Sequence, residues 1–224
     1  YFSTFDLKTV SAGGIDTIQV TKGPSSVLYG PNTLGGLVNV ITRRPAERPS
    51  LSLSGSTGDK NTRSLGAEGS YSWERFALAA NALYQDSDSF VFPDPGLGRT
   101  TRANSDFERL NLNAKLYYIP SERTEVMVNV GHYMSEYGMP PDLFGKPRYW
   151  RFKDWDRTSV NAGGYTALSD KATLRFRAFY VNYQNSLDWY KDSDYQVLDS
   201  ESTFDNSVYG LFGLGDFSLS GGNR

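Results

Sequence analysis

The side chains that most often perform catalysis are scarce in this 224-residue sequence. It contains no cysteine and one histidine, His132, which excludes disulfides, thiolate metal sites and multi-histidine centres. No nucleophile stands at a motif-like spacing from His132. Gly30 and Gly35 have the four-residue gap of a phosphate-binding P-loop, but Gly36 occupies the position that needs a lysine. We therefore expect no enzyme, no cofactor and no resident metal.

Side chains suited to binding gather in two aromatic segments. The first alternates cations with aromatic rings, and the second carries a Trp-Tyr pair. Such a surface can hold an anionic, aromatic-bearing chelate through charge and cation–π contacts. Our ligand-facing candidates are Arg148, Tyr149, Trp150, Trp189 and Tyr190.

A third segment is acidic. Six carboxylates surround a single lysine, Lys191: Asp188, Asp192, Asp194, Asp199, Glu201 and Asp205. Asp192 and Asp194 suit calcium, which prefers carboxylate oxygens, although a solvated loop is the alternative interpretation. The formal net charge of the whole chain is −2, so no basic excess exists to neutralise phosphates. We expect no nucleic-acid partner.

The elements that carry these segments show strict alternation of apolar and polar residues. From Arg109 to Tyr118 every even-numbered residue is apolar or aromatic, and the odd-numbered residues are polar or Tyr117. A period of two predicts a β-strand, and ten residues is about the length of a tilted strand that crosses a bilayer. The same pattern recurs in stretches that begin at Leu65, Phe76, Val126 and Leu174.

Charge decides which face of these strands meets lipid. A lysine or arginine facing hydrocarbon near the midplane costs roughly 2 to 4 kcal/mol. Lys115, Arg175 and Arg177 therefore belong to the inner face. His132 shares the outer phase of the valine stripe that begins at Val126, which predicts either a position near the membrane interface or a β-bulge.

Short and long connections alternate along the chain. Tight turns are predicted at Glu74-Arg75, 120–123 and 169–171, and long loops over about 86–105, 138–156 and 189–203. This asymmetry is typical of an outer-membrane β-barrel. A soluble β-sandwich is the alternative, but its strands usually run about 5 to 6 residues. Aromatic residues beside the turns and beside the loops predict two girdles: Tyr71, Trp73, Tyr117 and Tyr118, and Tyr84, Tyr133 and Tyr137.

Residues 1–47 follow a different pattern of short apolar segments broken by glycines. Residues 15–45 read IDTIQVTKGPSSVLYGPNTLGGLVNVITRRP. This run resembles the C-terminal half of the plug domain of TonB-dependent outer-membrane receptors. The motif residues that carry the resemblance are Lys22, Gly23, Pro24, Tyr29, Gly30, Gly35 and Gly36, followed by an apolar strand and Thr42-Arg43-Arg44-Pro45.

The resemblance implies an all-β membrane protein of the bacterial outer membrane. The expected fold is a partial antiparallel transmembrane β-barrel, about 8 of 22 strands, with part of an N-terminal plug domain. Residues 1–47 would be the plug half and residues 48–224 the first barrel strands. Both ends of the chain look cut, so the TonB box and the remaining strands would lie elsewhere, and the chain alone should not transport.

The family also implies a function and partners. The expected activity is TonB-dependent uptake of a scarce, bulky nutrient, most often a ferric siderophore; cobalamin, haem, a glycan and a purely structural or adhesion barrel are the alternatives. Expected partners are the TonB complex, outer-membrane lipid and lipopolysaccharide, whose phosphates offer another role for the basic residues of the first aromatic segment. Lys22 matches the family's basic plug residues that pair with barrel carboxylates, so we expect Lys22→Ala to loosen the plug.

Overall fold

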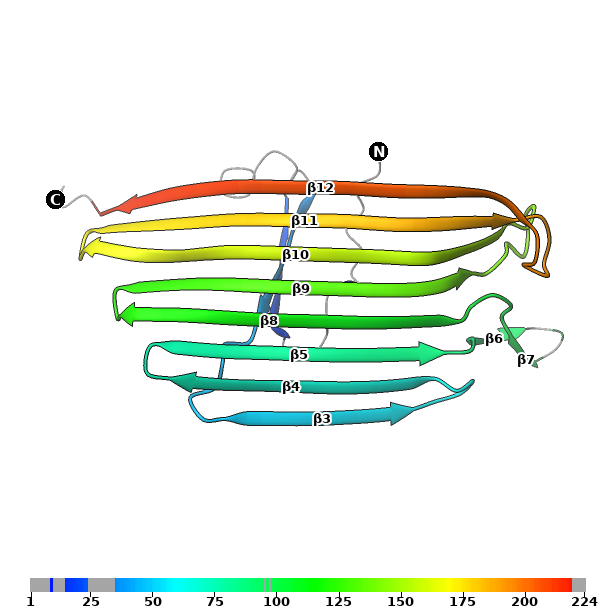
Figure 1. Cartoon of the computed structure of the whole chain (residues 1–224), viewed down its shortest axis with the longest axis horizontal. Coiled ribbons are helices and arrows are strands. Elements are labelled where there is room, and N and C mark those ends of the chain that lie inside the picture. Colours follow the sequence, from blue (N-terminus) through cyan, green and yellow to red (C-terminus); the bar gives the residue numbers. More distant parts are fainter. Residues whose placement is uncertain (1–8, 10–14, 24–34, 95, 97, 219–224) are drawn as a thin grey trace.

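A computed structural model describes residues 9, 15–23, 35–94, 96 and 98–218, which form almost entirely antiparallel β-structure (Figure 1). None of the described segments contains a helix long and apolar enough to cross a membrane. The strands are β1 (Ile15–Lys22), β2 (Gly36–Thr42), β3 (Ser50–Thr57), β4 (Arg63–Trp73), β5 (Phe76–Ser87), β6 (Val91–Asp94), β7 (Gly98–Thr101), β8 (Phe107–Ser121), β9 (Thr124–Met139), β10 (Tyr149–Ser169), β11 (Ala172–Tyr190) and β12 (Leu198–Phe217).

Eight of these strands form one continuous sheet in the order β12-β11-β10-β9-β8-β5-β4-β3. Each strand pairs with its sequence neighbour, apart from the separate β6–β7 hairpin between β5 and β8. The predicted fold class, a partial antiparallel barrel of about eight strands, is confirmed.

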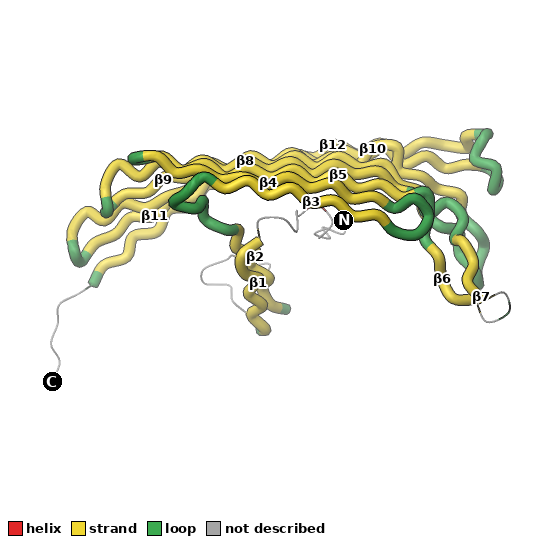
Figure 2. The backbone as a smooth tube through the Cα atoms, turned by 90° about the horizontal axis from the view of Figure 1, so that it is seen from below, coloured by secondary structure: helices red, strands yellow, loops and turns green. Residues whose placement is uncertain are grey.

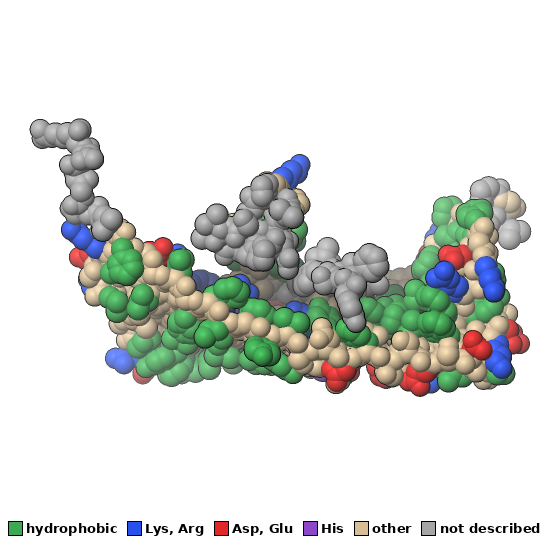
Figure 3. All heavy atoms as spheres, turned by 90° about the horizontal axis from the view of Figure 1, so that it is seen from above, with side chains coloured by type: hydrophobic (Ala, Val, Ile, Leu, Met, Phe, Trp, Pro, Cys, Tyr) green, Lys and Arg blue, Asp and Glu red, His purple; other side chains and the backbone are tan. Residues whose placement is uncertain are grey.

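The sheet is curved, and the hairpin of β1 and β2 lies on its concave side (Figure 2). This hairpin is a separate two-stranded sheet without ladder hydrogen bonds to the larger one. Hydrophobic side chains cover much of the convex side (Figure 3). The concave side is therefore the inner face and the convex side the outer face.

Register across the sheet places the predicted faces as expected. One outward rung is almost wholly apolar: Leu51, Gly69, Ala80, Ala114, Val130, Val160, Tyr180 and Tyr209. The neighbouring inward rung is mainly polar or small: Ser50, Ser70, Ala79, Lys115, Asn129, Asn161, Phe179 and Gly210. Arg175 and Arg177 share the inward phase of Phe179, as predicted.

Three two-residue turns join strands at one end of the sheet, at 74–75, 122–123 and 170–171. At the other end the predicted loops are partly wrong, because β10 begins at Tyr149, β11 continues to Tyr190 and β12 begins at Leu198. β10 has 21 residues and spans roughly 70 Å, more than an apolar band about 25 Å tall requires. Ladder pairing therefore continues beyond the bilayer.

A stacked aromatic girdle lies on the outer face near the short turns. Tyr71 and Trp73 have ring centroids 5.6 Å apart, Trp73 and Phe76 5.7 Å, and Phe76 and Tyr118 4.9 Å. The prediction that Tyr117 belongs to this girdle is wrong. Alternation along β8 turns Tyr117 to the inner face, where it is only 7% exposed.

The predicted girdle beside the loops is also partly wrong. Tyr84 faces outward in register with Leu110, whereas Tyr133 and Tyr137 share the inner phase of Asn129. Closeness to a loop was a poorer guide than phase along the strand.

His132 lies on the outer face without a bulge, since β9 keeps its register there with both neighbours. Its Nδ1 lies 2.8 Å from the hydroxyl of Thr158. The outer positions that follow across the sheet, Asn182 and Ser207, are polar. The apolar band therefore ends at this rung on β10–β12, which supports the interface explanation for His132.

Candidate functional site

Arg44, the second of two arginines that follow β2, makes the main contact at the junction between the β1–β2 hairpin and the sheet. Arg44 donates two hydrogen bonds of 2.9 Å to the two carboxylate oxygens of Glu125, on the inner face of β9. The guanidinium also lies 5.6 Å from the centroid of the Tyr117 ring. The hydrogen bonds from Arg44 to Glu125 raise the pKa of Arg44 above its ordinary value. A bidentate arginine–carboxylate pair fixes direction as well as distance.

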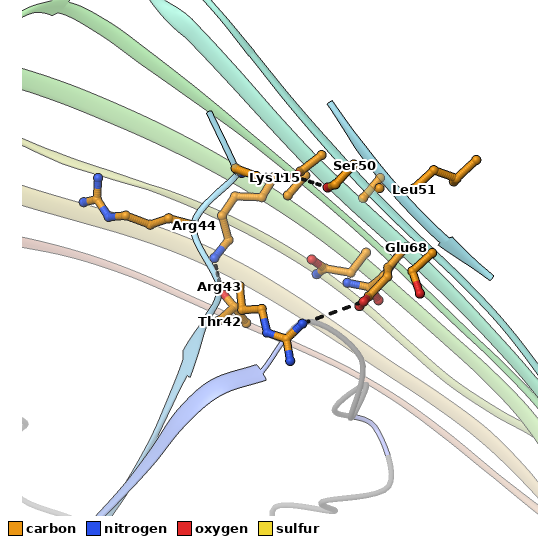
Figure 4. Close-up of a pocket in the computed structure, with 15 residues that line it drawn as sticks. Thr42, Arg43, Arg44, Ser50, Leu51, Glu68 and Lys115 are labelled. Atoms are coloured by element: carbon orange, nitrogen blue, oxygen red, sulfur yellow. Dashed lines mark hydrogen bonds and ion pairs between the residues drawn. The ribbon is translucent and has the colours of Figure 1, made fainter. Parts of the chain in front are cut away.

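Arg43 points away from Arg44, toward β4 (Figure 4). Its Nη1 lies 3.7 Å from Glu68, and the side chains of both residues are exposed, so this pair contributes little. On the same inner face, Lys115 donates a hydrogen bond to the hydroxyl of Thr42 (Figure 4).

The chain is attached to the sheet again just after the arginines. The Ala46 amide donates to Ser70 Oγ at 3.0 Å, and Ser72 Oγ donates to the Ala46 carbonyl at 2.9 Å. The hairpin is thus fastened to the inner wall by charge, hydroxyl and backbone contacts. A cavity of about 300 Å³ lies between these contacts.

The glycines of the hairpin motif differ in what they permit. Gly36 has a φ of +139°, and a Cβ there would lie 2.6 Å from the Thr21 carbonyl oxygen, so only glycine fits this close approach. Gly23 also has a left-handed φ, of +91°, whereas a side chain at Gly35 would meet open space. Of the other motif residues, Pro24, Tyr29 and Gly30 lie outside the described residues.

Lys22 lies at the end of β1 opposite Gly36 and is exposed. Within the described part of the chain no carboxylate forms an ion pair with it, and its predicted role in holding the plug stays a prediction. Sequence reasoning missed the pair of Arg44 and Glu125. The available signal was a carboxylate on the inward phase of a strand, together with the Arg43-Arg44 doublet.

The five ligand-facing candidates fall into two groups on opposite faces of the sheet. Trp150 and Trp189 stack at 5.2 Å on the inward phase of β11, and the Arg148 guanidinium lies 4.9 Å from the Trp150 ring. Tyr149 and Tyr190 lie opposite each other in register on the other face, where both contact Tyr195 edge-on.

An ion-pair cluster supports the start of β10. Arg151 donates to both carboxylate oxygens of Asp106, at 2.9 and 2.6 Å, and to Asn104 Oδ1 at 2.9 Å. The hydrogen bonds from Arg151 hold the pKa of Asp106 below its usual range.

The acidic segment contributes to the same region. Asp188 is almost fully buried, and its Oδ2 lies 2.9 Å from Lys153 Nζ. Asp192 accepts a hydrogen bond from the Asp194 amide in an exposed turn. Among the described residues, no three acidic or histidine side chains converge on a position for a metal ion. The calcium interpretation stays a prediction.

No protein-family model matches the chain, but several curated proteins match parts of it. The iron-regulated outer membrane virulence protein of Vibrio cholerae O395 is 39% identical over 54 residues, 24% of this chain and 8% of that protein. The ferrichrome outer membrane transporter/phage receptor of Escherichia coli K12 is 30% identical over 83 residues, 34% of this chain and 11% of that protein. The chain thus matches only a small part of each relative's length.

Similarity to solved structures extends over most of the chain. The copper transporter OprC has a TM-score of 0.73 at 16% identity, over 95% of this chain. The ferric-catecholate import receptor Fiu of E. coli K12 follows with 0.62 at 14% over 88%, and the siderophore receptor PiuA of Acinetobacter baumannii with 0.59 at 15% over 89%. The fold of the chain is that of these receptor structures, and part of its sequence is similar to that of named outer membrane proteins.

The predicted resemblance to TonB-dependent outer-membrane receptors and the expected location in the bacterial outer membrane are confirmed. The present chain spans 32% of each of these three receptor structures. The five similar proteins named above are described as transporters, receptors or outer membrane proteins. The eight-stranded sheet corresponds in fold to part of a β-barrel wall, and the ion pair of Arg44 and Glu125 lies on its inner side.

Arg44→Lys in the full-length receptor keeps the charge but removes the bidentate geometry. We expect the hairpin to loosen and the passive entry of large antibiotics to rise several-fold. Arg43→Lys is the matched control and should leave entry unchanged, because its pair with Glu68 is exposed. Vancomycin sensitivity at equal expression measures the difference. Equal sensitivity of both variants and wild type would show that Arg44 does not fasten the hairpin.

Asp106→Asn tests the support of β10 as a function of pH. Folding lowers the pKa of Asp106 below the ordinary aspartate value of about 3.9. The ionised carboxylate therefore stabilises the fold above that ordinary pKa, and this stabilisation is lost as the pH falls through the lowered pKa. Pepsin cleavage at the exposed Leu143-Phe144 should therefore be faster in Asp106→Asn than in wild type at pH 5, with the two rates converging near pH 2.

Asp170→Asn is the control for this experiment, because its pair with Arg123 lies at the opposite end of the sheet. Its cleavage rate should follow wild type at every pH. A ratio of Asp106→Asn to wild type that stays constant from pH 2 to 5 would contradict a role for the Asp106 charge.

Proposed function

We propose that the full-length protein imports a ferric siderophore across the outer membrane, driven by TonB. The observation that carries this proposal is the inner face of the sheet. It holds the hairpin through Arg44 and Glu125, and it presents the Arg148, Trp150 and Trp189 group at the loop end. An anionic chelate arriving from outside would meet the aromatic and cationic group before it reached the hairpin.

The names of similar proteins favour iron over the other nutrients. Fiu is titled a ferric-catecholate import receptor and PiuA a siderophore receptor. The Vibrio relative is named as iron-regulated, and the E. coli relative as a ferrichrome transporter. Iron in this proposal is part of the substrate, so the protein needs no metal of its own.

In the proposed transport cycle, residues 1–47 act as the C-terminal half of the plug and residues 48–224 as barrel wall. Substrate capture at the loop end precedes rearrangement of the plug, which the TonB complex drives through a segment outside this chain. The pair of Arg44 and Glu125 suits this step. In the resting state its two hydrogen bonds fix the orientation of the hairpin, and when the pair separates water can solvate both charged groups. Lys22 would add a second attachment to carboxylates of the complete barrel.

Binding and uptake of ⁵⁵Fe-siderophores by cells expressing the full-length receptor test the function. Uptake should require TonB, and Trp150→Ala combined with Trp189→Ala should weaken binding about tenfold or more, by loss of stacking and cation–π contact. Tyr149→Ala combined with Tyr190→Ala is the matched control from the opposite face and should bind normally. TonB-dependent uptake of cobalamin, haem or a glycan, with none of any ferric siderophore, would refute the proposal.

A further inference from the structure

A second cavity, of about 440 Å³, lies on the inner face at the loop end of β8 and β9. We call it the Arg109 cavity. Its lining includes Phe90, Phe107, Arg109, Tyr133, Ser135 and Tyr137. Phe107 and Arg109 face inward from β8, in register with Tyr137 and Ser135 of β9. The volume lies in the range that holds a small organic group, about 300 to 1,000 Å³.

The aromatic walls of the cavity are fixed by the surrounding structure. The backbone of Phe90 is held at both of its polar groups. Its amide donates to Ser105 Oγ at 2.9 Å, and its carbonyl accepts from the Arg102 amide at 2.9 Å. Tyr137 packs against Phe152 with ring centroids 5.0 Å apart. The rings therefore form a preformed slot that a planar group can enter without reordering the loop.

Arg109 gives the slot a positive charge that no carboxylate of the described residues neutralises through an ion pair. Its Nε donates to Gln85 Oε1 at 3.0 Å, and its guanidinium stacks 4.7 Å from the centroid of Phe107. Asp106 is the one carboxylate among the described lining residues, and Arg151 engages both of its oxygens. The terminal guanidinium nitrogens of Arg109, Nη1 and Nη2, remain as donors for an incoming anion.

A second arginine lies on the far side of Tyr133. Arg157 is the register partner of Tyr133 on β10, and its guanidinium lies 5.5 Å from the Tyr183 ring. Its buried Nε has no hydrogen-bond partner among the described residues. The buried Tyr133 of β9 thus has an arginine on the inner face of each neighbouring strand, Arg109 on β8 and Arg157 on β10.

We propose that the Arg109 cavity binds an anionic aryl group of the substrate, a catecholate or an aryl carboxylate, between its rings and its guanidinium. This assignment rests on the proposed function and narrows it. It selects chelates whose metal-binding oxygens are carried on aromatic rings, over neutral hydroxamate chelates, because a planar fork recognises paired anionic oxygens and aromatic walls stack on an aryl ring.

The test measures binding of two probes to the full-length receptor in detergent: the ferric complex of 2,3-dihydroxybenzoate, and ferrichrome. Arg109→Gln should weaken binding of the ferric catecholate roughly 10- to 100-fold, the loss expected for hydrogen bonds to a charged group. Phe90→Ala should weaken it as well. Arg99→Gln is the matched control and should bind like wild type, because Arg99 is an exposed residue of β7 whose partner is Asp59, in the turn between β3 and β4.

Each result separates the two claims. Catecholate binding that is unchanged in folded Arg109→Gln and Phe90→Ala would overturn the cavity assignment and leave siderophore import intact. Wild-type binding of ferrichrome without any binding of the ferric catecholate would also overturn the assignment alone. Binding of neither chelate, together with no uptake of any ferric siderophore, would overturn both. Heat-modifiable migration on gels verifies that each variant is folded.

Discussion

The structure depends on one constraint imposed by the bilayer, which is that a spanning backbone must satisfy its polar groups within the protein while alternate side chains meet hydrocarbon. A continuous antiparallel ladder with an apolar outer rung and a polar inner rung is the arrangement that meets both demands. The cross-strand row that runs from Leu51 on β3 to Tyr209 on β12 is such an outer rung. The row from Ser50 on β3 to Gly210 on β12 is the inner one. The polar interior, in turn, makes possible the ion pair that fastens the hairpin.

Much of the sheet could be predicted from sequence because alternation and turn spacing are local. The stretch 109–118 lies within β8, and the two-residue turn at 74–75 is where it was expected. The start of β10 could not be predicted. Bulges between Phe152 and Arg157 break the period of two, and the outer face there is polar because it lies beyond the lipid. Tyr117, Tyr133 and Tyr137 were misplaced because position near a turn was weighed above phase.

The candidate site shows the same division. The hairpin motif was recognisable because Gly36 must allow a close backbone approach, which restricts the residue type. The partner of the hairpin was not, since Arg44 and Glu125 are 81 residues apart and only the curvature of the sheet brings them together. Likewise, Tyr149 and Trp150 are adjacent in sequence but lie on opposite faces of the sheet. Residue composition alone could not assign each of them to its face.

The inside–outside assignment of the sheet is the claim on which the rest depends, and the absence of cysteine from these 224 residues allows it to be measured with single labels in the sheet. Single cysteines placed along β9 from Val126 to Gly131 can carry a spin label in the full-length receptor in lipid. Even-numbered positions should be relaxed mainly by oxygen, which partitions into hydrocarbon, and odd-numbered positions mainly by a water-soluble nickel chelate. Equal accessibility at all six positions, or the opposite alternation, would contradict the account.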